Sequence, residues 1–173
     1  MRRIYLIGYM GAGKTTIGKA LERHTSLSFI DLDYYIEGRF RKTISQLFAE
    51  KGEDAFRDLE RRMLHEVSEF EDVIISCGGG TPCFFDNIAY MNACGKTIYL
   101  KVSVPELAAR LECSKHTRPV LRNRSGEELK QFIRENLQAR SSFYEQAQVI
   151  FDAETMTTPE DIDLIVEALL RII

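Results

Sequence analysis

The sequence lacks the usual signs of a zinc-binding module. Its four cysteines form no C-x-x-C pair, and none of its three histidines stands at a zinc-finger offset from them. A structural zinc site is therefore not predicted. Reduced, buried thiols are the expectation for the cysteines, and the scattered histidines are expected to be structural or to lie on the surface.

The sequence also lacks a long apolar run and an excess of positive charge. Its longest apolar stretch, 164–173, is interrupted by Glu167 and Arg171 and is too short to cross a membrane. Arg2 and Arg3 precede only a short apolar run, and no cleavage pattern of small residues follows, so a signal peptide is not predicted. The net charge of −3 argues against a general nucleic-acid surface. We expect a cytoplasmic protein that binds neither a membrane nor nucleic acid.

Short apolar runs alternate along the chain with amphipathic segments. The apolar runs predict strands over 2–8, 27–33, 72–77, 96–103 and 149–153. The amphipathic segments predict helices over 14–24, 43–52, 53–70, 105–112, 127–147 and 158–173. This alternation is typical of an α/β fold with a parallel sheet, and the length of 173 residues suggests one domain, 1–173.

A glycine-rich loop, GYMGAGKTT, follows the first predicted strand and leads into the first predicted helix. It fits G-x-x-x-x-G-K-[ST] with Gly8, Gly13, Lys14 and Thr15. A bare backbone can curl its N–H groups around phosphates, Lys14 can reach the β- and γ-phosphates, and the Thr15 hydroxyl can coordinate Mg²⁺. The predicted ATP-binding residues here are Gly11, Ala12, Gly13, Lys14, Thr15 and Thr16. A plain glycine turn is the alternative, which the complete spacing disfavours.

The phosphate loop does not choose the reaction, because many NTPases, switches and kinases share it. Two carboxylates, Asp31 and Asp33, end the second predicted strand, where ligands of open α/β sheets bind. One could face the water shell of a metal ion and the other an acceptor hydroxyl. The alternative is a helix N-cap beside a solvent-exposed acid.

Three further features are candidates for the acceptor side. Arg57 and Arg140 lie on predicted helices, where each could also be an ordinary solvated arginine. The glycine triplet, 78–80, could be a plain turn or could let the backbone approach a substrate. The basic segment 113–126 predicts an exposed loop, in which Arg118 could close over the phosphates or could simply lie on the surface.

Six segments of the chain occur in the order found in one kinase family. They are GYMGAGKTTIGKAL, FIDLDYYIE, ISQLFAEKGEDAFRDLE, CGGGTP, RPVL and ARSSFYEQA. From about residue 4 to residue 152, the chain resembles the shikimate kinases. The combination of D-x-D, G-E-x-x-F-R, the glycine triplet and R-x-x-x-Y carries the resemblance. It implies transfer of the ATP γ-phosphate to the 3-hydroxyl of shikimate, in the chorismate route to aromatic amino acids.

The resemblance also implies roles on the acceptor side. Asp33 would hold the acceptor hydroxyl and act as its base. Arg57 and Arg140 would grip the shikimate carboxylate, and the backbone of Gly79 would hydrogen-bond the ring substituents. These roles agree with chemistry, because a small anionic polyol needs guanidinium groups for its carboxylate and a carboxylate for its reactive hydroxyl.

On the nucleotide side, the resemblance implies that Lys14 binds the phosphates and that Thr15 ligates Mg²⁺. Asp31 would orient the waters of the metal ion, and Arg118 would contact ATP from a lid over about 112–125. RPVL stands where R-P-L-L is commoner. Some members carry a further arginine early in the lid, where this chain has 111–115, which leaves a second lid contact to the adenine open.

The fold that the resemblance implies is the three-layer P-loop fold of the nucleoside monophosphate kinases. It has a five-stranded parallel sheet in the order 2-3-1-4-5, with helices on both faces and substrate-binding helices over about 33–62. A monomer is the family default. Gluconate kinase is an alternative with the same fold, and a nucleoside monophosphate kinase should show more arginines toward an acceptor phosphate. A non-catalytic ATP-binding module is the remaining alternative, against which Asp33, Arg57 and Arg140 argue.

Overall fold

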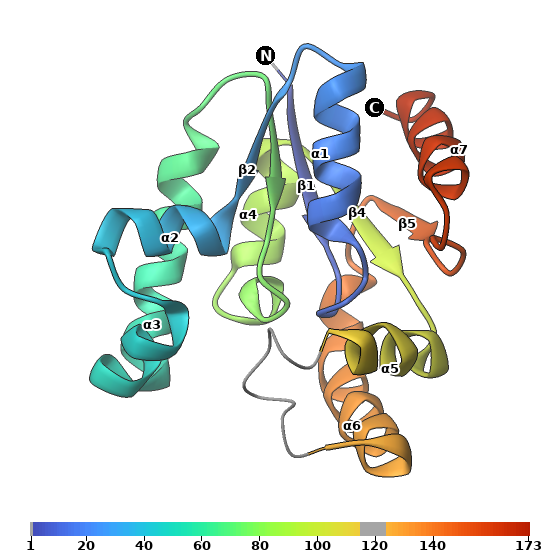
Figure 1. Cartoon of the computed structure of the whole chain (residues 1–173). Helices are drawn as coiled ribbons and strands as arrows, with labels where there is room; N and C mark the ends of the chain where they lie inside the picture. The colour runs from blue at the N-terminus through green and yellow to red at the C-terminus, as the bar shows by residue number, and fades with distance from the viewer. Residues whose placement is uncertain (1, 115–123) are drawn as a thin grey trace.

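Five parallel strands pair in the order β2-β3-β1-β4-β5 in the computed structural model, which describes residues 2–114 and 124–173 (Figure 1). The strands are β1 Arg3–Ile7, β2 Ser28–Asp31, β3 Val73–Ser76, β4 Lys96–Lys101 and β5 Val149–Asp152. This order confirms the fold expected above. Four of the five residues of β1 and all four of β3 are buried, as is normal for central strands covered on both faces.

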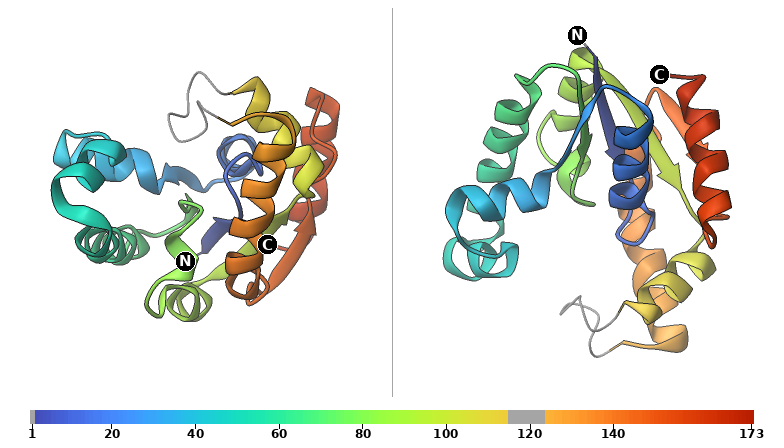
Figure 2. Two further views of the ribbon diagram at one scale, coloured as in Figure 1. Left: turned by 90° about the horizontal axis from the view of Figure 1, so that it is seen from below. Right: turned by 45° about the horizontal axis from the view of Figure 1, so that its top comes forward.

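Helices cover both faces of the sheet and give three layers. They are α1 Lys14–His24, α2 Leu32–Phe40, α3 Ile44–Ser68, α4 Asn87–Cys94, α5 Val104–Cys113, α6 Gly126–Tyr144 and α7 Pro159–Leu170. A short 3₁₀ turn, η1, spans Thr81–Cys83. Helices α1 and α7 lie side by side on one face, whereas α4 and α6 lie on the other (Figures 1 and 2). No described helix is both long and apolar enough to span a bilayer.

The strand register brings three chain segments to one level of the sheet. Ser76 of β3 pairs with Leu6 of β1 on one side and with Asp31 of β2 on the other. The glycine-rich loop, the D-x-D pair and the glycine triplet therefore begin at the same carboxyl edge, the lower edge in Figure 1. Ligands of open parallel sheets bind at this edge.

Two helices were not predicted from the apolar periodicity, although the first of them, α2, falls within the substrate-binding helices that the resemblance implied over about 33–62. The second strand was predicted to continue to Asp33, but β2 ends at Asp31 because the Asp31 carboxylate caps α2. It accepts hydrogen bonds from the backbone N–H groups of Asp33 and Tyr34. Helix α4 is short, and its apolar residues do not form a strong helical stripe, so no periodicity marked it.

The two helices predicted over 43–52 and 53–70 lie end to end in α3. Gly52 separates them with a φ of 78° and a ψ of 170°, far from helical values. Thr43 starts the first part with a capping box that it forms with Gln46. Helix α2 and the first part of α3 project beyond the β2 edge of the sheet (Figure 1).

The predicted basic loop is only partly within the described residues. Helix α5 continues to Cys113, and α6 starts at Gly126, so these two elements border the segment. Arg118 and the rest of 115–123 lie outside the described residues. The cysteine expectation was right for Cys77, which is buried, but wrong for Cys113, which is exposed at the end of α5.

Candidate active site

The glycine-rich loop joins β1 to α1 and is held by its own lysine. Gly11 and Gly13 have φ values of 83° and 95°, which residues with a side chain rarely adopt, so glycine is needed at both positions. The Lys14 ammonium donates hydrogen bonds to the carbonyl oxygens of Gly8 and Tyr9 at 2.8 and 2.9 Å. The loop therefore ends in a positive charge at the start of a helix, where the helix dipole favours an anion.

Asp31 links the nucleotide side of the site to the acceptor side. One of its carboxylate oxygens accepts the Thr15 hydroxyl hydrogen bond at 2.8 Å. Its other oxygen caps α2 by accepting from the N–H groups of Asp33 and Tyr34. The metal-site prediction and the N-cap alternative are thus compatible, because one carboxylate has enough acceptor positions for both.

Asp33 lies in the first turn of α2 and lines the cavity. Burial raises the pKa of its carboxyl from 3.8 to about 6, and the nearby carboxylates of Asp31 and Glu60 add to the rise. The Lys14 ammonium lowers the pKa but does not cancel these effects. A carboxylate with a pKa near 6 is ionised at neutral pH and is still a useful proton acceptor.

Arg57 is held in a largely dehydrated position on α3. Its side chain is only 11% exposed, and one guanidinium nitrogen donates to the Glu60 carboxylate at 2.8 Å. The guanidinium carbon lies 4.2 Å from the centre of the Phe84 ring and within 5.5 Å of the centres of the Phe48 and Phe56 rings. The aromatic rings and the carboxylate restrict the guanidinium to one orientation toward the cavity.

Glu60 is a site residue that sequence reasoning missed. Its side chain is 2% exposed, and its second oxygen accepts from the Thr81 hydroxyl at 2.7 Å. The carboxylate thereby connects α3 to the turn that follows the glycine triplet. Its only sequence signal is its place one helical turn after Arg57, a spacing that also occurs on solvated helix faces.

Arg140 and Tyr144 reach the site from one face of α6. The Arg140 guanidinium lies 5.7 Å from the centre of the Tyr9 ring in the phosphate loop. One turn later, the Tyr144 hydroxyl donates to the Gly79 carbonyl oxygen at 2.5 Å. The R-x-x-x-Y spacing thus ties α6 to the glycine triplet and directs Arg140 at the same cavity as Arg57.

A second unpredicted residue, Arg110, lies behind the phosphate loop. Its guanidinium donates to the carbonyl oxygen of Ala153 at 2.8 Å and to that of Gly11 at 3.3 Å, and Glu106 pairs with it at 2.8 Å. Arg110 immediately precedes 111–115, the segment in which some members of the family carry a further arginine. Arg110 therefore joins α5, the phosphate loop and the end of β5.

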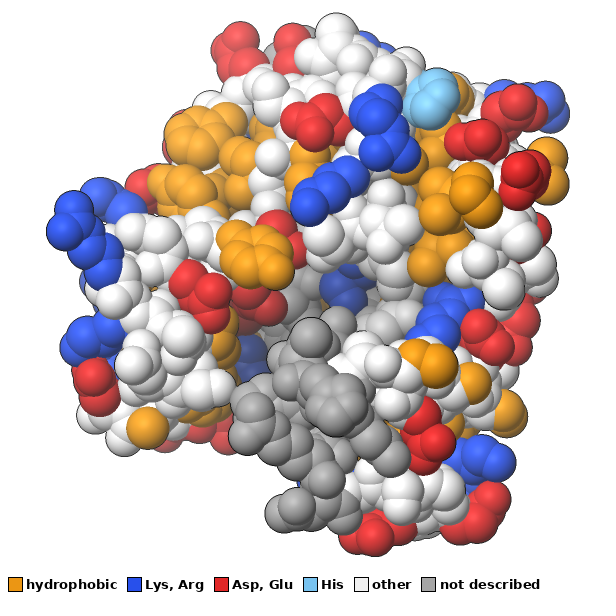
Figure 3. All heavy atoms as spheres, in the orientation of Figure 1, with side chains coloured by type: hydrophobic (Ala, Val, Ile, Leu, Met, Phe, Trp, Pro, Cys, Tyr) orange, Lys and Arg blue, Asp and Glu red, His pale blue; other side chains and the backbone are white. Residues whose placement is uncertain are grey.

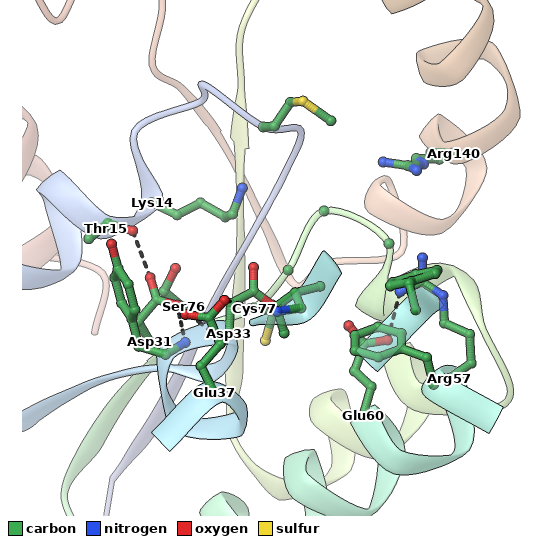
Figure 4. A pocket seen from close by; sticks show the side chains of 18 of the residues that line it. Lys14, Thr15, Asp31, Asp33, Glu37, Arg57, Glu60, Ser76, Cys77 and Arg140 are labelled. Atoms are coloured by element: carbon green, nitrogen blue, oxygen red, sulfur yellow. Dashed lines mark hydrogen bonds and ion pairs between the residues drawn. The ribbon is translucent and has the colours of Figure 1, made fainter. Parts of the chain in front are cut away.

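One cavity of about 610 Å³ is shared by the phosphate loop, the D-x-D pair, the glycine triplet and the side chains of Arg57, Glu60 and Arg140. In Figure 4, Lys14, Thr15, Asp31 and Asp33 lie toward one side, whereas Arg57 and Arg140 lie toward the other. The predicted residues that line it are Lys14, Thr15, Asp31, Asp33, Arg57, Gly79 and Arg140. The remaining loop residues, Gly11, Ala12, Gly13 and Thr16, form the turn and the start of α1 beside it.

Acidic and basic side chains are mixed on the surface, as the small net charge of −3 suggests (Figure 3). On the face shown in Figure 3, lysine and arginine side chains are interspersed with aspartate and glutamate side chains over most of the surface. Basic side chains also occur in a hollow near the middle of this face. Basic groups confined to a hollow that also holds carboxylates suit a small ligand better than an extended polyanion.

Comparison with known proteins identifies the family. The shikimate kinase family model matches residues 10–170. The chain belongs to the shikimate kinase family. A shikimate kinase of Parabacteroides distasonis is 64% identical to it over the full length of both chains. The crystal structure of a shikimate kinase from Bacteroides thetaiotaomicron superposes with a TM-score of 0.96 at 51% identity, covering 99% of this chain and 97% of that one.

A second solved relative carries a ligand. Shikimate kinase from Acinetobacter baumannii in complex with shikimate matches with a TM-score of 0.84 at 31% identity, covering 99% of this chain and 93% of that one. The resemblance to the shikimate kinases and the predicted enzyme class are confirmed. The chain is an ATP-dependent kinase of the shikimate pathway. The comparisons favour this prediction over the two alternatives, gluconate kinase and a non-catalytic ATP-binding module.

Proposed function

We propose that this chain transfers the γ-phosphate of ATP to the 3-hydroxyl of shikimate and releases shikimate 3-phosphate and ADP. One observation carries the proposal: a carboxylate, Asp33, and two guanidinium groups, Arg57 and Arg140, line the same cavity as the phosphate-loop lysine, Lys14. An acceptor that is both an acid and an alcohol satisfies both kinds of group at once.

Arg57 and Arg140 bind the shikimate carboxylate in this proposal. They come from two different helices, α3 and α6, and lie toward the same side of the cavity, so together they fix the direction in which the ring lies. The backbone N–H of Gly79 donates to the oxygen of a substituent on the ring. The dehydrated surroundings of Arg57 strengthen its attraction for an anion.

Asp33 receives the proton of the reacting hydroxyl. The hydroxyl oxygen forms a bond to the γ-phosphorus as the bond from that phosphorus to the bridging oxygen of ADP breaks. The released proton passes to the Asp33 carboxylate, which is ionised at neutral pH because its pKa is about 6. Positioning and charge stabilisation supply most of the catalysis in phosphoryl transfer, so the contribution of this base is one part among several.

Lys14 and the start of α1 hold the triphosphate. The loop N–H groups donate to the phosphate oxygens, and Lys14 neutralises charge on the β- and γ-phosphates. The residues proposed to form this site are Gly11, Ala12, Gly13, Lys14, Thr15 and Thr16. Arg118, which lies outside the described residues, is proposed to contact ATP from the lid over about 112–125.

Thr15 and Asp31 fit a magnesium ion that is bound together with ATP. A hydroxyl and a carboxylate are hard oxygen ligands, and their oxygens are already 2.8 Å apart. Mg²⁺ usually takes only one or two protein ligands and completes its shell with water and phosphate oxygens. Thr15 would hold the ion directly and Asp31 through water. When bound, the ion neutralises the charge that develops on the phosphates.

The test is ADP release from Mg²⁺-ATP with shikimate, gluconate, a panel of nucleoside monophosphates and no acceptor. We expect strong stimulation by shikimate alone. Stimulation by another acceptor would overturn the roles of Arg57 and Arg140 while keeping the ATP site. ATP binding without stimulation by any acceptor would refute catalysis.

A further inference from the structure

The glycine triplet consists of glycines whose backbone does not require glycine. Gly11 and Gly13 of the phosphate loop have positive φ values, but Gly78, Gly79 and Gly80 do not. Gly80, for example, has a φ of −88° and a ψ of −17°, which any residue adopts. Conformational freedom therefore does not explain these three positions, and the missing side chains need another reason.

Each glycine of the triplet faces a different charged group of the site. A Cβ atom on Gly78 would lie 3.0 Å from a carboxylate oxygen of Asp33. One on Gly79 would lie 3.3 Å from a guanidinium nitrogen of Arg140. These groups come from α2 and α6, so the triplet is where separate elements meet.

Gly80 makes the tightest of these approaches. A Cβ atom there would lie 2.6 Å from one guanidinium nitrogen of Arg57 and 2.9 Å from the guanidinium carbon. Real Cβ contacts are essentially never shorter than 3.0 Å, so the two cannot occupy these positions together. The same guanidinium is already bounded by the Phe84 ring at 4.2 Å and by the Glu60 carboxylate at 2.8 Å.

We propose that Gly80 is a positioning residue, whose missing side chain is the space in which the Arg57 guanidinium is held for the acceptor carboxylate. The proposal rests on the proposed function, in which Arg57 binds that carboxylate. It adds that the Arg57 orientation depends on the triplet as well as on Glu60. Three aromatic rings and one carboxylate surround the guanidinium on its other sides, and the backbone of Gly80 bounds it on the remaining one.

Substitution of Gly80 by alanine distinguishes the positioning of Arg57 from a general role of Gly80 in packing the fold. In Gly80→Ala, the atoms that must move belong to the far end of the flexible Arg57 side chain, so the backbone can stay in place. The fold should survive while the guanidinium is displaced. We expect kcat/KM for shikimate to fall by about tenfold or more, because bidentate recognition of a carboxylate depends on geometry. The KM for ATP should change by less than about twofold, since Arg57 lies across the cavity from Lys14.

Gly38 gives a matched control. It lies in α2 without a positive φ, and a Cβ atom there would have nothing within 4 Å. Gly38→Ala should therefore leave both KM values and kcat unchanged. An equal loss in the two variants would show that any alanine in this region disturbs the site, and would overturn the proposal.

A double-mutant cycle with Arg57→Ala decides the mechanism. The three atoms nearest to a Cβ atom on residue 80 all belong to the Arg57 guanidinium. Once that group is removed, adding Gly80→Ala should change kcat/KM for shikimate by less than about twofold. If Gly80→Ala lowers kcat/KM by the same factor in both backgrounds, the glycine acts on the substrate through its own backbone. That additive outcome would overturn the proposal.

The same four proteins are then unfolded in urea without any ligand. Gly80→Ala should lower the urea midpoint in the wild-type background, because it disturbs the Arg57–Glu60 pair, and should leave it nearly unchanged in Arg57→Ala. Coupled midpoints in a protein that shikimate does not stimulate would refute the proposed function and keep the packing relation. Uncoupled midpoints in an active enzyme would refute the positioning role alone.

Discussion

At the scale of single residues, Asp33 is the group whose chemistry can be tested most directly. Asp33→Asn removes the proton acceptor and keeps the shape of the side chain. We expect turnover to fall by about 10² to 10⁴, the usual contribution of a general base, while ATP still binds. Steady-state kinetics and ATP titration measure the two effects, and near-normal turnover would exclude Asp33 as the base.

The pH profile of the native enzyme should report the same group. Because the Asp33 carboxyl has a pKa of about 6, its reactive ionised form is lost as the pH falls through 6. We expect kcat/KM for shikimate to decrease by about tenfold per pH unit below that point. A profile that stays flat to pH 5, with the fold intact by circular dichroism, would contradict the assignment.

Asp33 should also cost stability at neutral pH. Its folded-state pKa of about 6 lies above the ordinary value of 3.8, so between these values the folded protein holds a proton that the unfolded chain has released. The contribution of this group to the free energy of unfolding therefore falls as pH rises through that window and remains low above it. We expect Asp33→Asn to melt at a higher temperature than the native protein at about pH 8, with the difference shrinking toward about pH 4.

The two acceptor arginines should differ in their structural effects. Arg57→Ala and Arg140→Ala should each raise the KM for shikimate by about tenfold or more and leave the KM for ATP within about twofold. Arg57→Ala also leaves the Glu60 carboxylate, which is 2% exposed, without its ion pair. Breaking such a buried pair costs about 3–5 kcal/mol of unfolding free energy, a loss that Arg140→Ala should not share.

Arg61 supplies the control for these two variants. It lies on the same helix as Arg57, is 35% exposed and pairs with the exposed Asp86. Arg61→Ala should leave both KM values unchanged and alter the unfolding free energy by about 1 kcal/mol or less, as exposed pairs do. Equal losses of shikimate and ATP affinity in the Arg57 and Arg140 variants would assign them a structural role.

At the scale of elements, Gly52 sets the angle between the two parts of α3. Its φ of 78° and ψ of 170° lie in a region that is essentially confined to glycine. A Cβ atom there would meet nothing within 4 Å, so Gly52→Ala tests the backbone alone. We expect a loss of about 1–3 kcal/mol in the free energy of unfolding and a higher KM for shikimate, because Phe48 and Arg57 lie on opposite sides of the break. An unchanged urea midpoint would contradict this prediction.

The same scale shows where local patterns are enough to predict structure. The apolar runs and the amphipathic segments involve residues close in sequence, and the helices predicted to begin at 43 and 158 do begin there, capped by Thr43 and Thr158. Periodicity did not mark α2, which only the resemblance implied, because Asp31 fits equally well as the end of a strand and as a helix cap. Only the three-dimensional structure shows that it serves both as the cap and as the partner of Thr15.

At the scale of the whole molecule, residues in short motifs could be predicted and residues with distant partners could not. The phosphate loop and the D-x-D pair are contiguous in the sequence. Arg57 and Arg140 were candidates that could equally have been solvated arginines, and the family resemblance supplied their role. Arg110 hydrogen-bonds to Gly11 across a separation of 99 residues, and no local pattern marks that contact. The strand order likewise came from the resemblance, because periodicity does not show which strands are neighbours.

Magnesium should act on the reaction and leave the fold intact. Asp31 is already satisfied by the Thr15 hydroxyl and by two backbone N–H groups, so the fold does not need the ion at this place. We expect EDTA to reduce turnover by more than about 100-fold and to shift Tm by about 1 °C or less. Added Mg²⁺ should restore the rate, and a large fall in Tm would instead indicate a structural metal.

The separation of charge across the cavity gives it a polarity that any inhibitor must respect. Asp31 and Asp33 lie toward one side in Figure 4, and Arg57 and Arg140 toward the other. A reversed molecule would set its carboxylate against two carboxylates and would bring no acid to either guanidinium group. A competitor built to span the cavity therefore needs its acid at the arginine end, and a basic amine at the opposite end would find two acidic neighbours in place of a hydroxyl partner.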